Sequence, residues 1–188
     1  KFESVNASNP VVVGNEVFIS ETYGPGSSLL SFRPGGYTIT WRDAEKSRKK
    51  AMQTHWNTPI HHEGYLYGSS GRHSSTAELR CIEWRTGKVR WSEKGLSRCS
   101  LLYVDGYFLC LGEYGTLRLF RANPKKFDQI ASTVLSKQDS GSAGRPLKYP
   151  AWAAPILSHG LLYVRGRDRL FCLELIAQQE ASEDESVE

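Results

Sequence analysis

Residues 81–91, with the sequence CIEWRTGKVRW, constrain the fold more than any other part of the chain. Thr86-Gly87 is a tight-turn signal, because glycine adopts positive φ without a Cβ clash. The residues before this pair are largely apolar, and residues 88–91 alternate between polar and apolar with a period of two, as strands do. The stretch therefore predicts a β-hairpin that ends on a large aromatic side chain, Trp91.

A second pattern occurs four times along the chain. It consists of a short apolar segment, a two-residue turn that contains glycine, and another apolar segment. Repetition with a period of about 50 residues is the signature of a repeat architecture. Corresponding residues in the four copies lie 49, 42 and 54 residues apart, and they are Phe18, Tyr67, Leu109 and Tyr163.

Each copy continues into a second pair of predicted strands. Trp41 stands nine residues past Phe32, just as Trp91 stands nine past Ile82, so the first two copies share the aromatic position. The third copy departs from this pattern at residues 121–124, which predicts a longer outer hairpin. Four strands per repeat, with turns between them and little amphipathic helix, predict an all-β chain built from β-propeller blades.

The repeats divide the chain into blades of about residues 6–50, 51–98 and 99–150, and a three-stranded remainder at 151–175. Residues 1–5 read as one further strand that could complete the last blade. Residues 1–175 thus amount to four blades' worth of four-stranded antiparallel sheet, either a partial propeller or half of one with seven to eight blades. Residues 176–188 are expected to be a disordered acidic tail, because they are rich in Glu and Asp and poor in large apolar groups.

The spacing Cys81-x-Glu83-x-x-Thr86-Gly87-x-x-x-Trp91 resembles the tryptophan-docking repeat of PQQ-like (quinoprotein) β-propellers. Residues 6–175 as a whole resemble the C-terminal half of the BamB-like members of that group. The resemblance implies that Trp91, and Trp41 in a degenerate copy, dock on a neighbouring blade, with Thr86 and Gly87 as structural docking residues. It also implies a bacterial protein in the periplasm or outside the cell, and pairing of this chain with an N-terminal half or with a second copy.

The resemblance further implies a non-catalytic scaffold that presents its loops and blade faces to a protein or polysaccharide partner. Exposed aromatic and arginine side chains near loops are the natural contact groups, because such residues dominate interface energetics. For Trp152 the favoured interpretation is a core residue, since it leads into a predicted strand, and it is kept as a binding candidate. The candidate binding residues are Trp56, Arg72, Tyr149, Trp152 and Arg165.

The alternative function is part of a PQQ-dependent quinoprotein oxidoreductase of the alcohol dehydrogenase type, with PQQ and calcium as cofactors. No cofactor is expected under the preferred interpretation, and no catalytic residue is assigned. Gly68-Ser69-Ser70-Gly71 is one residue short of a Gly-x-Ser-x-Gly nucleophile elbow. Asp168, which lies among arginines, is the most constrained acid, and it is expected to form an ion pair.

The charge pattern argues against a nucleic-acid partner. The chain has 24 basic and 20 acidic residues, a formal net charge of +4, and residues 42–50 concentrate the cations. A solvated loop or one helical turn between blades is the favoured interpretation, and binding of an anionic polymer is the alternative. Nucleic acid is not expected, because no aromatic residue alternates with these cations to stack on bases. No run of 18 apolar residues occurs, so no membrane span is predicted.

The cysteines do not predict a disulfide framework. Cys81 and Cys172 occupy the same position in two repeats and are expected to be small buried strand residues. Across a turn at Asp105-Gly106, Cys110 would face Leu101, which leaves Cys99 diagonal to it rather than opposite.

The histidines do not predict a metal site. His61 and His62 are adjacent on a predicted strand and therefore point to opposite faces, so they cannot chelate one ion together. No Cys/His spacing typical of zinc is present. His55 is expected to have a structural hydrogen-bonding role.

Overall fold

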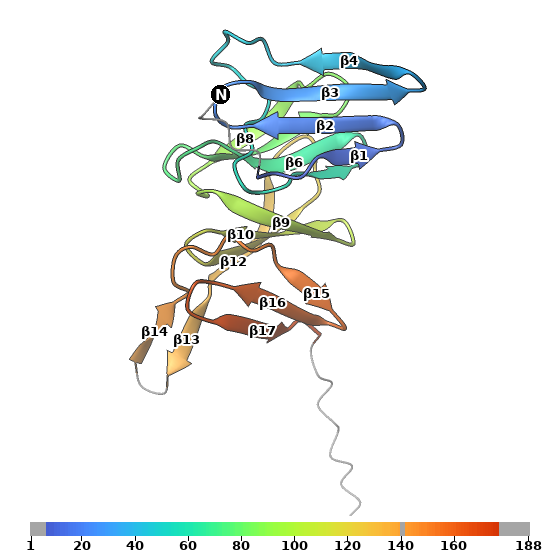
Figure 1. The fold of residues 1–188 in the computed structure, drawn as a ribbon. Coiled ribbons are helices and arrows are strands. Elements are labelled where there is room, and N and C mark those ends of the chain that lie inside the picture. Colours follow the sequence, from blue (N-terminus) through green and yellow to red (C-terminus); the bar gives the residue numbers. More distant parts are fainter. Residues whose placement is uncertain (1–6, 140–141, 177–188) are drawn as a thin grey trace, which may run out of the picture.

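The computed structural model describes residues 7–139 and 142–176. Strands and turns make up this part of the chain, so the predicted all-β β-propeller architecture is confirmed. Four antiparallel sheets of three or four strands follow one another along the sequence, and in each the strands are hydrogen-bonded in chain order. Figure 1 shows the sheets stacked from the first, at the top of the view, to the fourth, in the lower half.

Each of the first three sheets has four strands, and the fourth has three within the described residues. Sheet 1 contains β1 (Val11–Val13), β2 (Glu16–Glu21), β3 (Gly26–Arg33) and β4 (Gly36–Arg42). Sheet 2 contains β5 (Ile60–His62), β6 (Tyr65–Ser70), β7 (Glu78–Glu83) and β8 (Val89–Lys94). Sheet 3 contains β9 (Cys99–Val104), β10 (Tyr107–Gly112), β11 (Thr116–Arg121) and β12 (Asp128–Val134). Sheet 4 contains β15 (Ile156–Ser158), β16 (Leu161–Arg165) and β17 (Leu170–Glu174).

The first hairpin of each sheet turns where the sequence predicts it. Glu63-Gly64, Asp105-Gly106 and His159-Gly160 have positive φ at both residues. This is the type I′ geometry, which matches the right-handed twist of the flanking strands. The pairing that follows from it places Phe18, Tyr67, Leu109 and Tyr163 at corresponding positions on their second strands.

The core consists of three apolar layers, one between each pair of consecutive sheets. Phe18 and Leu29 of sheet 1 pack against Leu66 and Ile82 of sheet 2. Sheets 2 and 3 meet through a second cluster of buried residues, and sheets 3 and 4 through a third that is mostly leucine. Each sheet is therefore apolar on the faces that contact its neighbours.

Trp41 links sheet 1 to sheet 2. Its indole N–H donates to the backbone oxygen of Trp84 at 2.8 Å, and its ring lies against the turn at Gly87. Gly87 has φ +70°, and a Cβ added there would lie 2.7 Å from the Trp41 ring. The turn is held by Thr86 Oγ1, which donates to Glu83 Oε2 at 2.6 Å and accepts from the Lys88 N–H.

Trp91 makes the equivalent link from sheet 2 to sheet 3. Its indole N–H donates to the backbone oxygen of Asn123 at 2.8 Å. Its ring lies 5.8 Å from that of Phe127 and 6.5 Å from that of Phe120, measured between centroids. Both tryptophans thus reach from the outer strand of one sheet to the outer hairpin of the next.

A buried carboxylate adds a second link between sheets 1 and 2. Glu16 on β2 accepts from the Trp84 indole N–H at 2.7 Å and from Arg85 Nη1 at 2.6 Å. The carboxylate is therefore hydrogen-bonded and paired with a cation, which is what a buried charge requires.

The third repeat differs from the first two as expected. Residues 122–127 separate β11 from β12, so the outer hairpin is longer. After β12, a polar stretch of the chain contains a separate hairpin of β13 (Ser136–Asp139) and β14 (Ser142–Pro146), which the sequence analysis did not predict. The proposed strand at residues 1–5 and most of the proposed tail at 176–188 lie outside the described residues.

One expectation for the cysteines is wrong, and the others are confirmed. Cys172 is exposed rather than buried, because β17 presents it on the face of sheet 4 that points away from sheet 3. Cys81, at the corresponding position, is buried because sheet 3 covers it. All four cysteines are free, and Cys110 pairs with Leu101 while Cys99 pairs with Gly112.

The contact between Trp41 and Gly87 generates a prediction about stability. Gly87→Ala should lower the free energy of unfolding by about 2–4 kcal/mol, because the methyl group adds a clash to the cost of positive φ. Gly64→Ala is the matched control: its φ is +81°, but nothing lies within 4 Å of the added Cβ. Urea denaturation measures both, and an equal loss in the two variants would show that the ring contact is unimportant.

Candidate functional site

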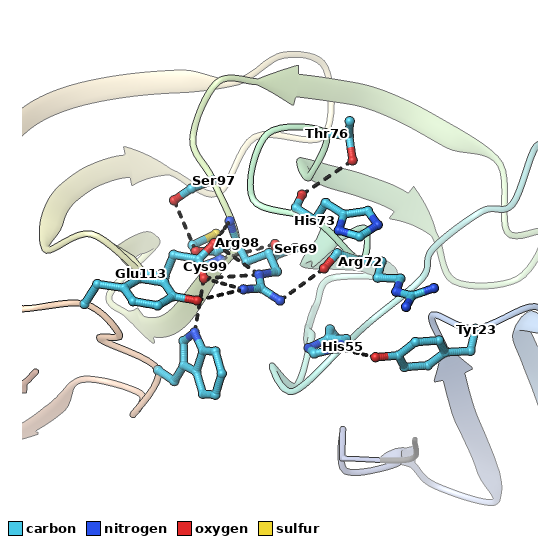
Figure 2. A network of polar contacts seen from close by, with 12 residues as sticks. Tyr23, His55, Ser69, Arg72, His73, Thr76, Ser97, Arg98, Cys99 and Glu113 are labelled. Carbon is cyan, nitrogen blue, oxygen red and sulfur yellow. Dashed lines mark hydrogen bonds and ion pairs between the residues drawn. The ribbon is translucent and has the colours of Figure 1, made fainter. Parts of the chain in front are cut away.

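The candidate site lies where the connections between sheets meet the loops between second and third strands (Figure 2). Aromatic side chains, two arginines and one carboxylate converge there from the loops of sheets 1, 2 and 3 and from the connections between sheets. We call this group the loop-face cluster. It comprises Tyr23, His55, Trp56, Arg72, Arg98, Glu113, Tyr149 and Trp152.

Trp56, Arg98 and Trp152 occupy the same position in three consecutive repeats. Each stands four residues before the strand residue that pairs with the aligned Tyr67, Leu109 or Tyr163. The Trp56 and Trp152 rings stack with centroids 5.6 Å apart, and Arg98 Cζ lies 5.6 Å from the Trp152 ring centroid. The repeat architecture therefore brings these three side chains together.

A buried ion pair lies at the base of the cluster. Glu113 is fully buried, and its Oε2 accepts from Arg98 Nη2 at 2.7 Å and from the Trp152 indole N–H at 3.1 Å. Arg98 Nε lies 3.1 Å from both carboxylate oxygens. Burial alone would raise the pKa of Glu113, but the hydrogen bonds and the positive charge of Arg98 outweigh it and hold the pKa below its ordinary value.

Arg98 also joins three segments of the chain. Its Nη1 donates to the backbone oxygen of Arg72 at 3.1 Å, and its Nη2 donates to the Tyr149 hydroxyl at 3.4 Å. The backbone on both sides of Trp152 is anchored to sheet 3, because Ala151 N–H donates to Glu113 O at 2.9 Å and Ser100 Oγ donates to Trp152 O at 3.1 Å. The tryptophan is thus held by its backbone as well as by its indole.

The other flank of the cluster comes from sheet 1. The Tyr23 hydroxyl and His55 Nε2 form a hydrogen bond of 3.0 Å, and Arg72 Cζ lies 4.7 Å from the centroid of the Tyr23 ring. Burial, followed by the nearby Arg98 and Arg72 charges, lowers the pKa of His55, which favours its neutral form. The structural hydrogen-bonding role expected for His55 is confirmed.

Two buried polar atoms in the cluster have no hydrogen-bond partner among the described residues. They are Trp56 Nε1 and His55 Nδ1. Unpaired buried groups are uncommon because each loses its hydration without compensation. Three further buried atoms without a partner, Glu21 Oε1, Thr22 Oγ1 and Arg118 Nη1, belong to residues outside the cluster.

An open pocket of about 620 Å³ adjoins the cluster. It is bordered by loops of sheets 2 and 3, and the ring of Tyr114 at its edge stacks on Tyr149 with centroids 5.1 Å apart. The pocket and the aromatic rings thus form one continuous surface. The residues that line the pocket are His73, Ser74, Ser75, Gly95, Ser97 and Tyr114.

Four of the five candidate binding residues lie in the cluster. Trp56, Arg72, Tyr149 and Trp152 are there, and Trp152 is 40% exposed, which does not fit the core interpretation. Arg165 is exposed at the end of β16, and none of the cluster contacts found among the described residues involves it.

Sequence reasoning missed the ion pair of Arg98 and Glu113. The signal was present, because Arg98 takes the repeat position held by tryptophan in the second and fourth copies. A cation at that position needs an acid beside it, and Glu113 follows directly after an apolar strand.

Asp168, His61 and His62 form ion pairs or ring contacts with neighbouring side chains. Within residues 7–139 and 142–176, no three His, Cys, Asp or Glu side chains are placed to hold a metal ion. Asp168 pairs with Arg169 at 2.7 Å, as expected, and accepts from the Lys148 N–H. His61 packs on Trp84 while His62 packs on Tyr103, so the two rings do lie on opposite faces.

The stacked four-stranded sheets define a partial β-propeller, and the loop-face cluster lies at the loops of that propeller. Comparison with solved structures agrees on the fold. BamB from Moraxella catarrhalis aligns with a TM-score of 0.58 and 13% identity over 89% of this chain. The computationally designed Ika4 protein aligns with a TM-score of 0.57 and 12% identity, covering 92% of each chain. The resemblance to BamB-like propellers is therefore confirmed at the level of the fold.

The PilY1 C-terminal domain from Pseudomonas aeruginosa aligns with a TM-score of 0.56 and 16% identity over 83% of this chain. This chain spans 42% of the length of both the BamB and the PilY1 structures. A scan against protein-family models and a search of curated proteins find no match. None of the described segments forms a helix that is long and apolar enough to cross a membrane.

The buried ion pair generates a second prediction. Glu113→Gln should lower the free energy of unfolding by about 3–5 kcal/mol, because Arg98 remains buried without its counter-charge. Glu45→Gln, at an exposed position, should change it by less than about 0.5 kcal/mol. Replacing both partners, as Glu113→Gln with Arg98→Met, should recover part of the loss. Urea denaturation at pH 7 checks all three.

The dependence on pH follows from the same pair. Since the pKa of Glu113 is lower in the folded chain than its ordinary value of 4.5, the unfolded chain takes up the proton first. The contribution of the ionised Glu113 carboxylate to the free energy of unfolding is complete above about pH 4.5 and declines as the pH falls below that value. The wild type should therefore lose more stability than Glu113→Gln between pH 5 and pH 3. Parallel profiles for the two proteins would contradict the role given to Glu113.

Proposed function

We propose that this chain is a non-catalytic β-propeller binding module that recognises a protein partner through the loop-face cluster. The observation that carries the proposal is the convergence of tryptophan, tyrosine and arginine side chains over a buried ion pair. These three residue types are enriched among the groups that contribute most to protein interfaces. The nearby pocket would admit side chains of the partner.

The exposed part of the cluster supplies the contact groups. Tyr149 and Trp152 are 41% and 40% exposed on one flank of the cluster, and Arg72 is exposed on the other flank, over the Tyr23 ring. Their rings and guanidinium would lose water on binding, while the indole and hydroxyl groups retain hydrogen-bonding capacity. Such a surface favours a partner that presents apolar side chains together with a carboxylate for Arg72.

The buried part of the cluster supplies rigidity. Trp152 is fixed by Glu113, and Tyr149 is held between Arg98 and the ring of Tyr114. Side chains already fixed before binding lose less conformational entropy when the partner arrives. The ion pair thus supports binding without touching the partner.

The experiment compares variants of the tagged chain in partner capture. A protein retained by the wild type is identified by mass spectrometry and titrated against each variant. Trp56→Ala and Arg72→Ala should each weaken binding at least tenfold, which is about 1.4 kcal/mol. Arg165→Ala is the matched control, since that arginine is exposed but lies outside the cluster, and its affinity should equal the wild type.

Equal retention of the partner by Trp56→Ala and Arg72→Ala would overturn the proposal. Retention of a polysaccharide instead, with the same dependence on these residues, would keep the site and change the class of partner. An absorbance change on adding PQQ and calcium would support the oxidoreductase alternative.

A further inference from the structure

The first sheet has an apolar face with nothing over it among the described residues. By strand pairing, Val17 and Leu30 correspond to Leu66 and Ile82 of sheet 2, so the equivalent of Ile82 is Leu30 rather than Phe32, which the tryptophan spacing indicated. Leu66 and Ile82 are fully buried against sheet 1. Val17 and Leu30 themselves are only half-buried, because no sheet among the described residues packs on them. The outward face of sheet 1 therefore carries core-type residues at core positions.

The apolar surface continues across all four strands of sheet 1. The pairing register puts Val12, Ile39 and Tyr37 on the same face as Val17 and Leu30. Val12 is 63% exposed and Tyr37 is 58% exposed. A contiguous apolar face of this kind usually marks an interaction site. We call it the leading face, and its members are Val12, Val17, Ile19, Leu30, Phe32, Tyr37 and Ile39.

The fourth sheet has a complementary uncovered face. Tyr163 and Cys172 take the positions of Tyr67 and Cys81, which sheet 3 covers completely in the second repeat. Ile156, paired with Tyr163, is 63% exposed, and Leu170 at the edge is 61% exposed. We call this surface the trailing face, because in the other sheets it is the side that contacts the following sheet.

We propose that the trailing face of one chain packs on the leading face of a second copy of the same chain. Figure 1 shows sheets 1 and 4 at opposite ends of the stack, so the two faces do not meet each other within the described residues. The contact would continue an interface that the structure already makes three times, between sheets 1 and 2, 2 and 3, and 3 and 4.

In an assembly of two copies, the leading and trailing faces of both chains are covered. A head-to-tail contact uses one leading and one trailing face, and a two-fold arrangement repeats it once and closes. The resulting assembly would contain eight sheets, within the range of four to eight blades that propellers form around a channel. This inference concerns the end sheets and does not depend on the partner proposed for the loop-face cluster.

The existing interfaces identify which residues would meet. Cys81 of sheet 2 packs in the same cluster as Phe120 of sheet 3, and Leu29 of sheet 1 in the same cluster as Ile82 of sheet 2. Cys172 has the position of Cys81, and Leu30 has the position of Ile82. Cys172 of one copy should therefore lie against Leu30 of the other. Cys172 is also the one exposed cysteine among the four in the chain.

The test combines solution mass with cross-linking of the full chain. Light scattering should give twice the single-chain mass of 21.1 kDa. Under a mild oxidant, Leu30→Cys should form a disulfide-linked dimer that reducing agent dissolves. The double variant Leu30→Cys/Cys172→Ser should form none. Thr38→Cys, exposed on β4 but on the opposite face, is the matched control and should also form none.

A single-chain mass at concentrations of tens of micromolar would overturn the proposal. So would a Leu30→Cys dimer that forms equally well without Cys172, because the two leading faces would then be meeting each other. If Leu30→Cys proves poorly folded, Val17→Cys on the neighbouring strand gives the same comparison.

Discussion

The structure depends on the indole N–H of an outer-strand tryptophan reaching the backbone of the next sheet. A sheet of four short strands is apolar on both faces here and cannot remain in water alone, so each must be fixed against a neighbour. Trp41 and Trp91 do this with one hydrogen bond and one large ring each. These two contacts hold the outer strands of sheets 1 and 2 against the outer hairpins of sheets 2 and 3.

The interface between sheets 3 and 4 has no docked tryptophan among the described residues. Ala131 pairs with Leu119 at the position where Trp41 pairs with Leu29 and Trp91 with Cys81. Sheets 3 and 4 are joined instead by a leucine-rich layer and by the hydrogen bond from Ala151 to Glu113. The loop-face cluster therefore has a structural role at the one interface without a docked tryptophan, as well as the binding role proposed for it.

The sequence predicted the fold well because its signals are local. Glycine at a two-residue turn and alternation along a strand depend on neighbours in the chain, so the first hairpins and the strand pairing in them could be predicted. The extra hairpin of β13 and β14 could not, since residues 136–146 are polar and carry no alternation. The exposure of Cys172 was also missed, because repeat position predicts burial only when a following sheet is present.

The site was predicted less completely. Trp56 and Trp152 could be chosen as aromatic residues near loops, but their stacking depends on how three repeats are arranged in space. Arg98 and Glu113 are ordinary residues when considered one at a time, and only the register between β9 and β10 places them opposite each other. A comparison of the same position across the repeats, rather than along the chain, would have found Arg98.

Hydrogen exchange of the indole N–H groups, followed by nuclear magnetic resonance, tests the central claim most directly. The account predicts that the Trp41 and Trp91 indole protons exchange as slowly as the amides of the central strands, because both are released only when the sheets separate. Exchange of these two protons at the rate of a solvent-exposed indole, while the strand amides stay protected, would show that the sheets are held together by other contacts.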